Sequence, residues 1–129
     1  MTPLIESYLA LAEEDLAVAR KVLDAFPRHA AYAVQQSAEK LVKAVLSAEG
    51  IPVPAQHHLG ALAQLLPADH VWRAEFAGLD GLSSYATTIR YPLPGGRMPK
   101  NPDQRELKEQ LRVVASLIDD VRDWCRERN

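Results

Sequence analysis

Cysteine is nearly absent from this sequence, since Cys125 is the only one in 129 residues. A single cysteine cannot form a disulfide within the chain, which fits a reducing compartment and predicts a cytoplasmic protein. An excess of positive charge is also missing, because the formal net charge is −2. The chain as a whole is therefore not an electrostatic binder of DNA, and any anion site must come from local clustering.

Long apolar runs and metal-binding motifs are absent as well. No apolar stretch approaches ~18 residues, so no membrane span is expected, and the start, MTPLIESYLALAEEDL, lacks the features of a signal peptide. There is no Cys-x-x-Cys, no His-Glu-x-x-His and no carboxylate-rich loop, so we expect neither a metal site nor a cofactor. Cys125 is expected to pack rather than react, and no catalytic residue can be assigned.

The most helix-prone stretch is residues 30–50, AAYAVQQSAEKLVKAVLSAEG, which is rich in alanine and contains no proline. Gly50, with Pro52 close behind it, predicts the end of this helix. Apolar side chains cover most of its circumference, which is typical of a helix at the centre of a bundle. The narrow polar stripe on its other side consists of Gln36, Lys40, Lys43 and Ser47.

Other segments show helical periodicity too. The first helix is predicted over residues 4–26, with Thr2 as N-cap and Pro27 as its end. Short helical pieces are expected at residues 59–66 and 71–79, and the pattern around Leu79, Leu82, Tyr85 and Ile89 predicts helix with a break in it. A final helix, capped by Asp103, should reach about residue 127, and its apolar stripe should pack within the bundle or across a dimer interface. We therefore predict a single all-α domain, residues 1–129, folded as an up-and-down four-helix bundle with additional short helices.

The clearest functional signal is a basic segment without acids. From Gly81 to Pro102 there is no Asp or Glu, while Arg90, Arg97 and Lys100 are present. Residues 91–102 hold four prolines and two glycines, which predicts an irregular loop. Arginine presents a planar fork suited to phosphate or carboxylate. This segment is therefore a candidate anion site for a nucleotide or a nucleic-acid backbone.

Tyr85 and Tyr91 flank Arg90 and offer aromatic faces on which a base could stack. The alternative is that Arg90 pairs with a carboxylate of the bundle, Asp15 or Glu39, and fixes the end of a helix. The polar stripe of the central helix likewise has two interpretations, a cleft or subunit contact on one hand and a solvent-facing strip on the other.

The sequence resembles a known family in four places, one of which is DLAVARKVL at residues 15–23, similar to that family's first helix. AYAVQQSAEKLVKAVLSAEGI in the central helix, the His58-Leu59 step and YATTIRYP at residues 85–92 are similar to the HEPN domain (higher eukaryotes and prokaryotes nucleotide-binding). The resemblance spans roughly residues 4–125. Its most specific parts are Gln35-Gln36-x-x-Glu39-Lys40 and Arg90-Tyr91-Pro92.

The resemblance implies a helical bundle that forms homodimers or higher oligomers and associates with nucleotides or RNA. It also implies a partner, a minimal nucleotidyltransferase, in a toxin–antitoxin-like pair. Many HEPN toxins are metal-independent RNases whose motif places a histidine four to six residues after an arginine, in a site shared by two subunits. No histidine follows Arg90 in that range, so binding is predicted rather than catalysis.

The predicted function is thus a HEPN-type module that binds a nucleotide or nucleic-acid phosphate, pairs with a nucleotidyltransferase, or both. One alternative is a metal-independent endoribonuclease in which His57 or His58 supplies the missing histidine across a dimer. Another is a purely structural interaction protein that uses the stripe from Leu107 to Cys125 as its partner face. The predicted site residues are Arg90, Tyr91, Tyr85, Lys40 and Arg97, with His58, Gln36 and Lys43 as further candidates.

Overall fold

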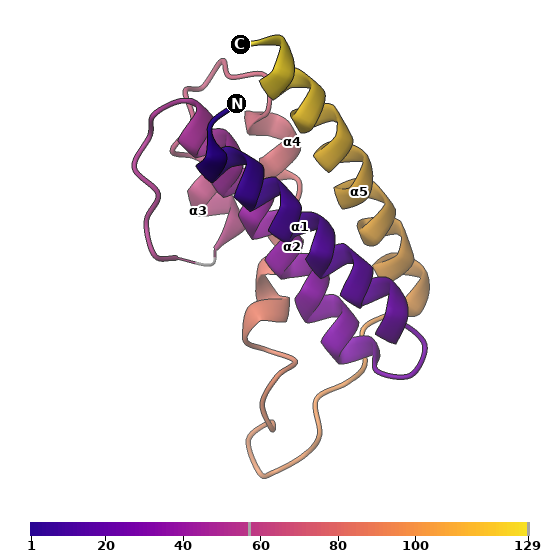
Figure 1. The fold of residues 1–129 in the computed structure, drawn as a ribbon. Helices are drawn as coiled ribbons and strands as arrows, with labels where there is room; N and C mark the ends of the chain where they lie inside the picture. Colours follow the sequence, from indigo (N-terminus) through magenta and orange to yellow (C-terminus); the bar gives the residue numbers. More distant parts are fainter. Residues whose placement is uncertain (57, 129) are drawn as a thin grey trace.

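The computed structural model describes residues 1–56 and 58–128, and all regular structure within them is helical (Figure 1). His57, considered above as a catalytic candidate, lies outside the described residues. Three helices are long and three are short, and together they confirm the predicted all-α bundle. In chain order the elements are α1 (Pro3–Val22), α2 (Pro27–Ala48), α3 (Leu59–Ala63), α4 (Arg73–Ala77), the 3-10 helix η1 (Asp80–Ala86) and α5 (Gln104–Glu127).

The boundary between the first two helices differs from the prediction. α1 ends at Val22 rather than near residue 26, and Pro27 does not end α1 but begins α2. Proline suits the first turn of a helix, because its missing N–H would have no partner there. The central helix therefore starts three residues earlier than Ala30, and the short connection places α1 and α2 side by side and antiparallel (Figure 1).

The ends of the long helices are fixed by local chemistry. The hydroxyl of Thr2 accepts a hydrogen bond from the Ile5 N–H at 3.3 Å, and the carboxylate of Asp103 accepts one from the Glu106 N–H at 2.9 Å. Both caps confirm the prediction. Gly50 follows α2 with a φ of 69°, a left-handed conformation that glycine adopts without steric cost.

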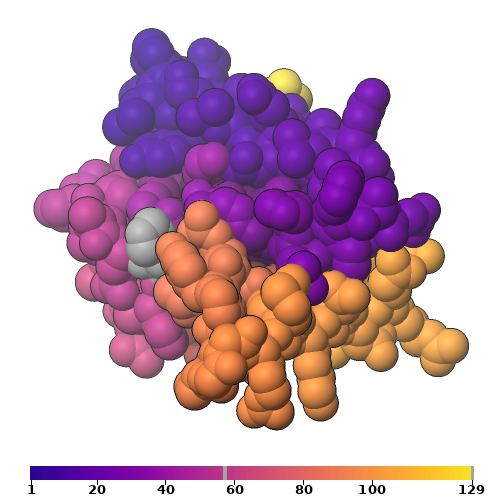
Figure 2. All heavy atoms as spheres, turned by 90° about the horizontal axis from the view of Figure 1, so that it is seen from below, coloured from indigo at the N-terminus to yellow at the C-terminus, as the bar shows by residue number. Residues whose placement is uncertain are grey.

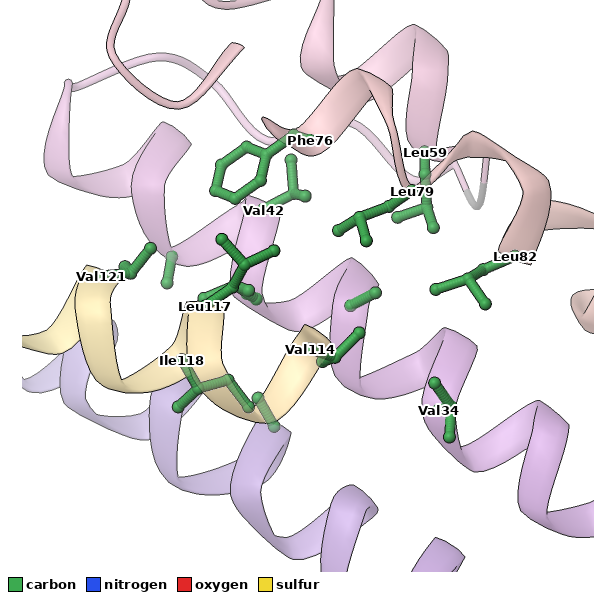
Figure 3. Packing of buried hydrophobic residues seen from close by; sticks show 14 of the residues in the cluster. Val34, Val42, Leu59, Phe76, Leu79, Leu82, Val114, Leu117, Ile118 and Val121 are labelled. Carbon is green, nitrogen blue, oxygen red and sulfur yellow. The ribbon is translucent and has the colours of Figure 1, made fainter. Parts of the chain in front are cut away.

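α2 is the central helix, since it packs against α1, α5, α3 and η1. Its small side chains let α1 approach closely, and the Ser37 hydroxyl donates a hydrogen bond to the Ala12 carbonyl of α1 at 2.7 Å. The three short helices fill the fourth position of the bundle. Figure 3 shows Phe76, Leu79 and Leu82 from this part of the chain facing side chains of α2 and α5.

The apolar stripe of α5 is used entirely within this core. Leu107, Val114 and Val121 are fully buried, and Cys125 is 3% exposed. Figure 3 shows the middle of the stripe among buried side chains that include Val42 of α2 and Phe76 of α4, with Ile118 beside α1. The stripe from Leu107 to Cys125 is therefore unavailable as a partner face, which corrects the structural-interaction hypothesis in the form stated above.

The bundle has two distinct ends. Both termini lie at one end, whereas the α1–α2 connection and the loop of residues 91–102 lie at the other (Figure 1). We call these the terminal end and the loop end. Within the loop, the Leu93 N–H donates to the Arg97 carbonyl at 2.7 Å, and Gly95 and Gly96 supply the two positive φ angles of the turn.

None of the helices in residues 1–56 and 58–128 combines the length and the apolar character that crossing a membrane requires.

Candidate functional site

A hollow of about 390 Å³ lies at the loop end, between the first turns of α2 and the loop of residues 91–102. Seen from below, the loop of residues 91–102 lies directly against the start of α2 (Figure 2, orange against purple). We call this space the Arg90 hollow. It is lined by Arg28, His29, Tyr32, Ile89, Arg90, Tyr91, Pro92, Met98 and Pro99.

Arg90 is held by aromatic rings rather than by an acid. Its guanidinium carbon lies 4.0 Å from the centroid of the Tyr32 ring and 5.7 Å from that of Tyr91, which are cation–π distances. Its Nη1 donates a hydrogen bond to the Ala86 carbonyl at 3.4 Å. These contacts fix the position of the guanidinium without neutralising its charge.

The alternative in which Arg90 pairs with Asp15 or Glu39 is wrong. Asp15 forms an ion pair with Lys40 at 2.6 Å, and Glu39 forms one with Lys43 at 3.1 Å. Arg90 makes no ion pair in the parts of the chain that the structure describes.

Arg28 supplies a second cation to the same hollow. Its Nη1 donates to the Asn101 side-chain oxygen at 3.0 Å and to the Pro99 carbonyl at 3.4 Å, and both acceptors are neutral. No Asp or Glu is among the described residues that line the hollow. Two unneutralised guanidinium groups therefore create a local positive potential in a chain whose net charge is negative.

Of the predicted site residues, only Arg90 and Tyr91 line this hollow. Tyr85 faces α5 instead, where its hydroxyl donates to the Gln110 side-chain oxygen at 3.3 Å. Burial is the main cause that raises the pKa of Tyr85 above its ordinary value. Arg97 lies exposed in the turn of the loop, outside the hollow.

The polar stripe of α2 also lies apart from Arg90. Lys40 follows Tyr32 by eight residues, which is about 12 Å along the helix axis. Besides the Lys40 and Lys43 ion pairs, the Gln36 amide donates to the Gln35 side-chain oxygen at 2.8 Å. These contacts join α1 to α2 and brace α2 itself.

His58 is not part of the hollow either. It lies at the start of α3, with its Nδ1 3.2 Å from a carboxylate oxygen of Asp80. The same carboxylate oxygen accepts a hydrogen bond from the Gly60 N–H at 2.8 Å. His58 thus belongs to the contact between α3 and η1.

The sequence prediction missed the three residues that α2 contributes to the hollow, Arg28, His29 and Tyr32. A usable signal was present, because the stripe that contains Gln36 continues toward the N-terminus by steps of four and three residues to Tyr32 and His29. The prediction that the helix begins at Ala30 cut this stripe short. Recognising Pro27 as a helix start would have brought Arg28 and His29 onto the helix.

Groups for metal binding or nucleophilic chemistry are not gathered in the described parts of the chain. No cluster of three or more His, Cys, Asp or Glu side chains that could hold a metal ion is found in residues 1–56 and 58–128. Burial raises the pKa of the Cys125 thiol, and a buried, protonated thiol is unreactive.

Comparisons with known proteins agree with the helical fold. The model of the HEPN domain family matches residues 5–124 of the chain. The crystal structure of an archaeal HEPN homologue superposes with a TM-score of 0.70 at 25% sequence identity, covering 94% of this chain and 97% of that one. No curated protein sequence matches significantly.

Proposed function

The chain belongs to the HEPN domain family, and on that premise we propose that its Arg90 hollow binds a phosphate group of a nucleotide or a nucleic acid. One observation carries the proposal. The Arg90 guanidinium is positioned over Tyr32 in a hollow of about 390 Å³, with no carboxylate partner among the described residues.

A guanidinium has five N–H donors in a planar fork, which matches the oxygens of a phosphate group. Only Nη1 of Arg90 donates to an acceptor in the described structure. The remaining donors are available to a ligand, and charge-assisted hydrogen bonds of this kind are the strong ones. Tyr91 is 59% exposed beside the guanidinium, so its ring can stack on a base.

Calorimetric titration with ATP and AMP tests the proposal, with Arg128→Ala as the matched control. Arg128 also lies over an aromatic ring but contacts Glu49 at the terminal end. We expect saturable binding that Arg90→Ala weakens at least tenfold, since hydrogen bonds to charged groups contribute about 1.5–3 kcal/mol. Arg128→Ala should leave the affinity unchanged. Absence of saturable binding, or equal weakening by both substitutions, would contradict the proposal.

A second candidate function is metal-independent cleavage of RNA, and the position of His29 favours it. The imidazole lines the same hollow as Arg90, so one space holds a side chain that can carry a proton in acid–base cleavage and a cation suited to phosphate. His29 would then take the role that the sequence assigned to His57 or His58. RNA incubated with the protein and a chelator should be cut by the wild type and by His58→Ala but not by His29→Ala. RNA that stays intact with the wild type rules this candidate out.

A homodimer also remains a proposal, for which the outer face of α1 offers a surface. Leu4, Leu11 and Val18 are 57%, 45% and 49% exposed and follow one another at seven-residue intervals. Leu4 and Val18 are equally far from Leu11 along the helix. In two antiparallel α1 helices related by a twofold axis at Leu11, Leu11 would therefore meet Leu11 of the second copy, and Leu4 would meet its Val18. Light scattering should show a dimer that Leu11→Glu converts to a monomer, and a monomeric wild type would refute this arrangement.

A nucleotidyltransferase partner and a cytoplasmic location rest on the family resemblance and on the single cysteine. Co-expression with a nucleotidyltransferase encoded beside this chain, followed by affinity purification, tests the partner. Cell fractionation tests the location.

A further inference from the structure

We propose that the loop end binds two consecutive nucleotides of one single strand, the first in the Arg90 hollow and the second in an adjoining hollow beside Phe26. This inference rests on the proposed function, because it assigns the Arg90 hollow to one of the two nucleotides. It adds a second subsite and requires a ligand longer than a mononucleotide.

The second space, the Phe26 hollow, measures about 210 Å³. Arg28 and His29 line both hollows, so their side chains form a shared wall between the two spaces. The Phe26 hollow is lined by Ala25, Phe26, Pro27, Arg28, His29 and Asn101.

The sizes of the two hollows favour one continuous ligand. Sites for small molecules measure about 300–1,000 Å³, and the Arg90 hollow falls at the lower end of this range. The Phe26 hollow is smaller than an independent site of that kind. It suits a neighbouring part of the same molecule.

The shared wall carries the charge that a linking phosphate needs. Arg28 is tethered by Asn101 and Pro99, both of which leave its positive charge intact. No described Asp or Glu lines either hollow. A phosphodiester between two nucleosides would therefore lie beside Arg28, with the two bases on either side of it.

Aromatic surface is exposed on both sides of this wall. Tyr91 lies in the Arg90 hollow and Phe26 in the other, and both are 59% exposed. The His29 ring meets Phe26 edge-on with ring centroids 6.0 Å apart, which holds Phe26 in place. Stacking on an aromatic side chain requires an unpaired base, so the arrangement selects single strands over duplexes.

Calorimetric titration with AMP, ADP and the dinucleotide pApA tests this inference. ADP adds phosphate charge to AMP without adding a second base. We expect pApA, in its ribo or its deoxyribo form, to bind at least tenfold more tightly than either mononucleotide. Phe26→Ala should weaken pApA at least fivefold and leave AMP unchanged, because AMP occupies only the Arg90 hollow. Val71→Ala, which truncates another exposed apolar side chain, should change neither affinity.

Several results would overturn the inference. These are pApA binding no more tightly than ADP, Phe26→Ala weakening AMP and pApA equally, or a base-paired hairpin displacing pApA as well as a single strand does. Failure of the proposed function gives a different result, in which Arg90→Ala changes the affinity of none of the ligands. If AMP binding depends on Arg90 while pApA shows no advantage, the function stands and the second subsite does not.

Discussion

Two arginines lie over aromatic rings at opposite ends of this bundle, and only one of them is neutralised. Arg90 lies 4.0 Å from the centre of the Tyr32 ring at the loop end, and Arg128 lies 4.3 Å from that of Trp124 at the terminal end. Arg128 also contacts the Glu49 carboxylate, whereas Arg90 has no carboxylate partner in the described structure. A cation–π contact therefore does not mark a binding site by itself, and the local balance of charge distinguishes the two ends.

At the terminal end, Glu49 pairs with both His70 and Arg128. The backbone N–H of Trp72 donates to His70 Nδ1 at 3.1 Å, and His70 Nε2 lies 3.1 Å from a Glu49 carboxylate oxygen. With its proton on Nε2, the His70 ring donates to Glu49 through Nε2 and accepts from the Trp72 backbone through Nδ1. The Trp124 ring packs against His70 with centroids 5.5 Å apart, so aromatic surface is used for packing here and is left exposed at the loop end.

The two phenylalanines of the chain give the largest expected contrast between the ends. Phe76 is fully buried and stacks on Trp72, whereas Phe26 is 59% exposed. Phe76→Ala should lower the free energy of unfolding by about 3–5 kcal/mol. Phe26→Ala should stay within about 0.5 kcal/mol of the wild type. Urea denaturation measures both, and a similar cost for the two substitutions would mean that Phe26 is part of the core.

Removal of Glu49 tests whether the terminal end serves stability alone. The side chain of His70 is only 7% exposed. Glu49→Ala therefore leaves its Nε2–H buried without an acceptor. The free energy of unfolding should fall by about 1–3 kcal/mol, while the affinity for nucleotides stays unchanged. Arg90→Ala should show the opposite, with stability within about 0.5 kcal/mol and a clear loss of affinity. A Glu49→Ala protein of full stability and weakened binding would reverse the assignment of the two ends.

The smallest effect should appear at alkaline pH. Burial raises the pKa of Cys125 above 9.0 and that of Tyr85 above 10.0. Both folded-state pKa values exceed the unfolded ones, so the stability from each group is complete below its unfolded pKa and is lost as pH rises through the folded one. Urea denaturation at pH 8, 9.5 and 11 measures the free energy of unfolding. Cys125→Ala should reduce the loss of stability that begins above pH 9, and Tyr85→Phe should reduce the loss of stability that begins above pH 10. Unchanged pH profiles in both variants would contradict this assignment.

Local sequence signals were sufficient to predict that the chain is helical and to place the caps of the first and last helices, but not the boundary between α1 and α2. Thr2 and Asp103 each act as a cap through their own side chain and the residues that follow, so their roles can be read from adjacent positions. The apolar stripe of α5 likewise predicts burial from spacing alone. Pro27 was misinterpreted because proline is compatible both with the end of one helix and with the start of the next.

The candidate site was only partly predictable, because its residues come from distant segments. Arg90 and Tyr91 are adjacent in sequence, so the acid-free segment revealed both. Tyr32 reaches them only through the packing of α2 against the segment that follows η1. The pairing of Lys40 with Asp15 depends on how α1 and α2 are rotated against each other, which periodicity alone does not determine.

The tether between Arg28 and the loop has a practical consequence. Arg28 holds the loop through Pro99 and Asn101, and the two exposed trypsin cleavage points of this loop, after Arg97 and Lys100, lie on the same stretch of chain. A phosphate that draws the Arg28 guanidinium away would loosen this attachment and change the rate of proteolysis there. Limited digestion would then report occupancy of the loop end without any label on protein or ligand.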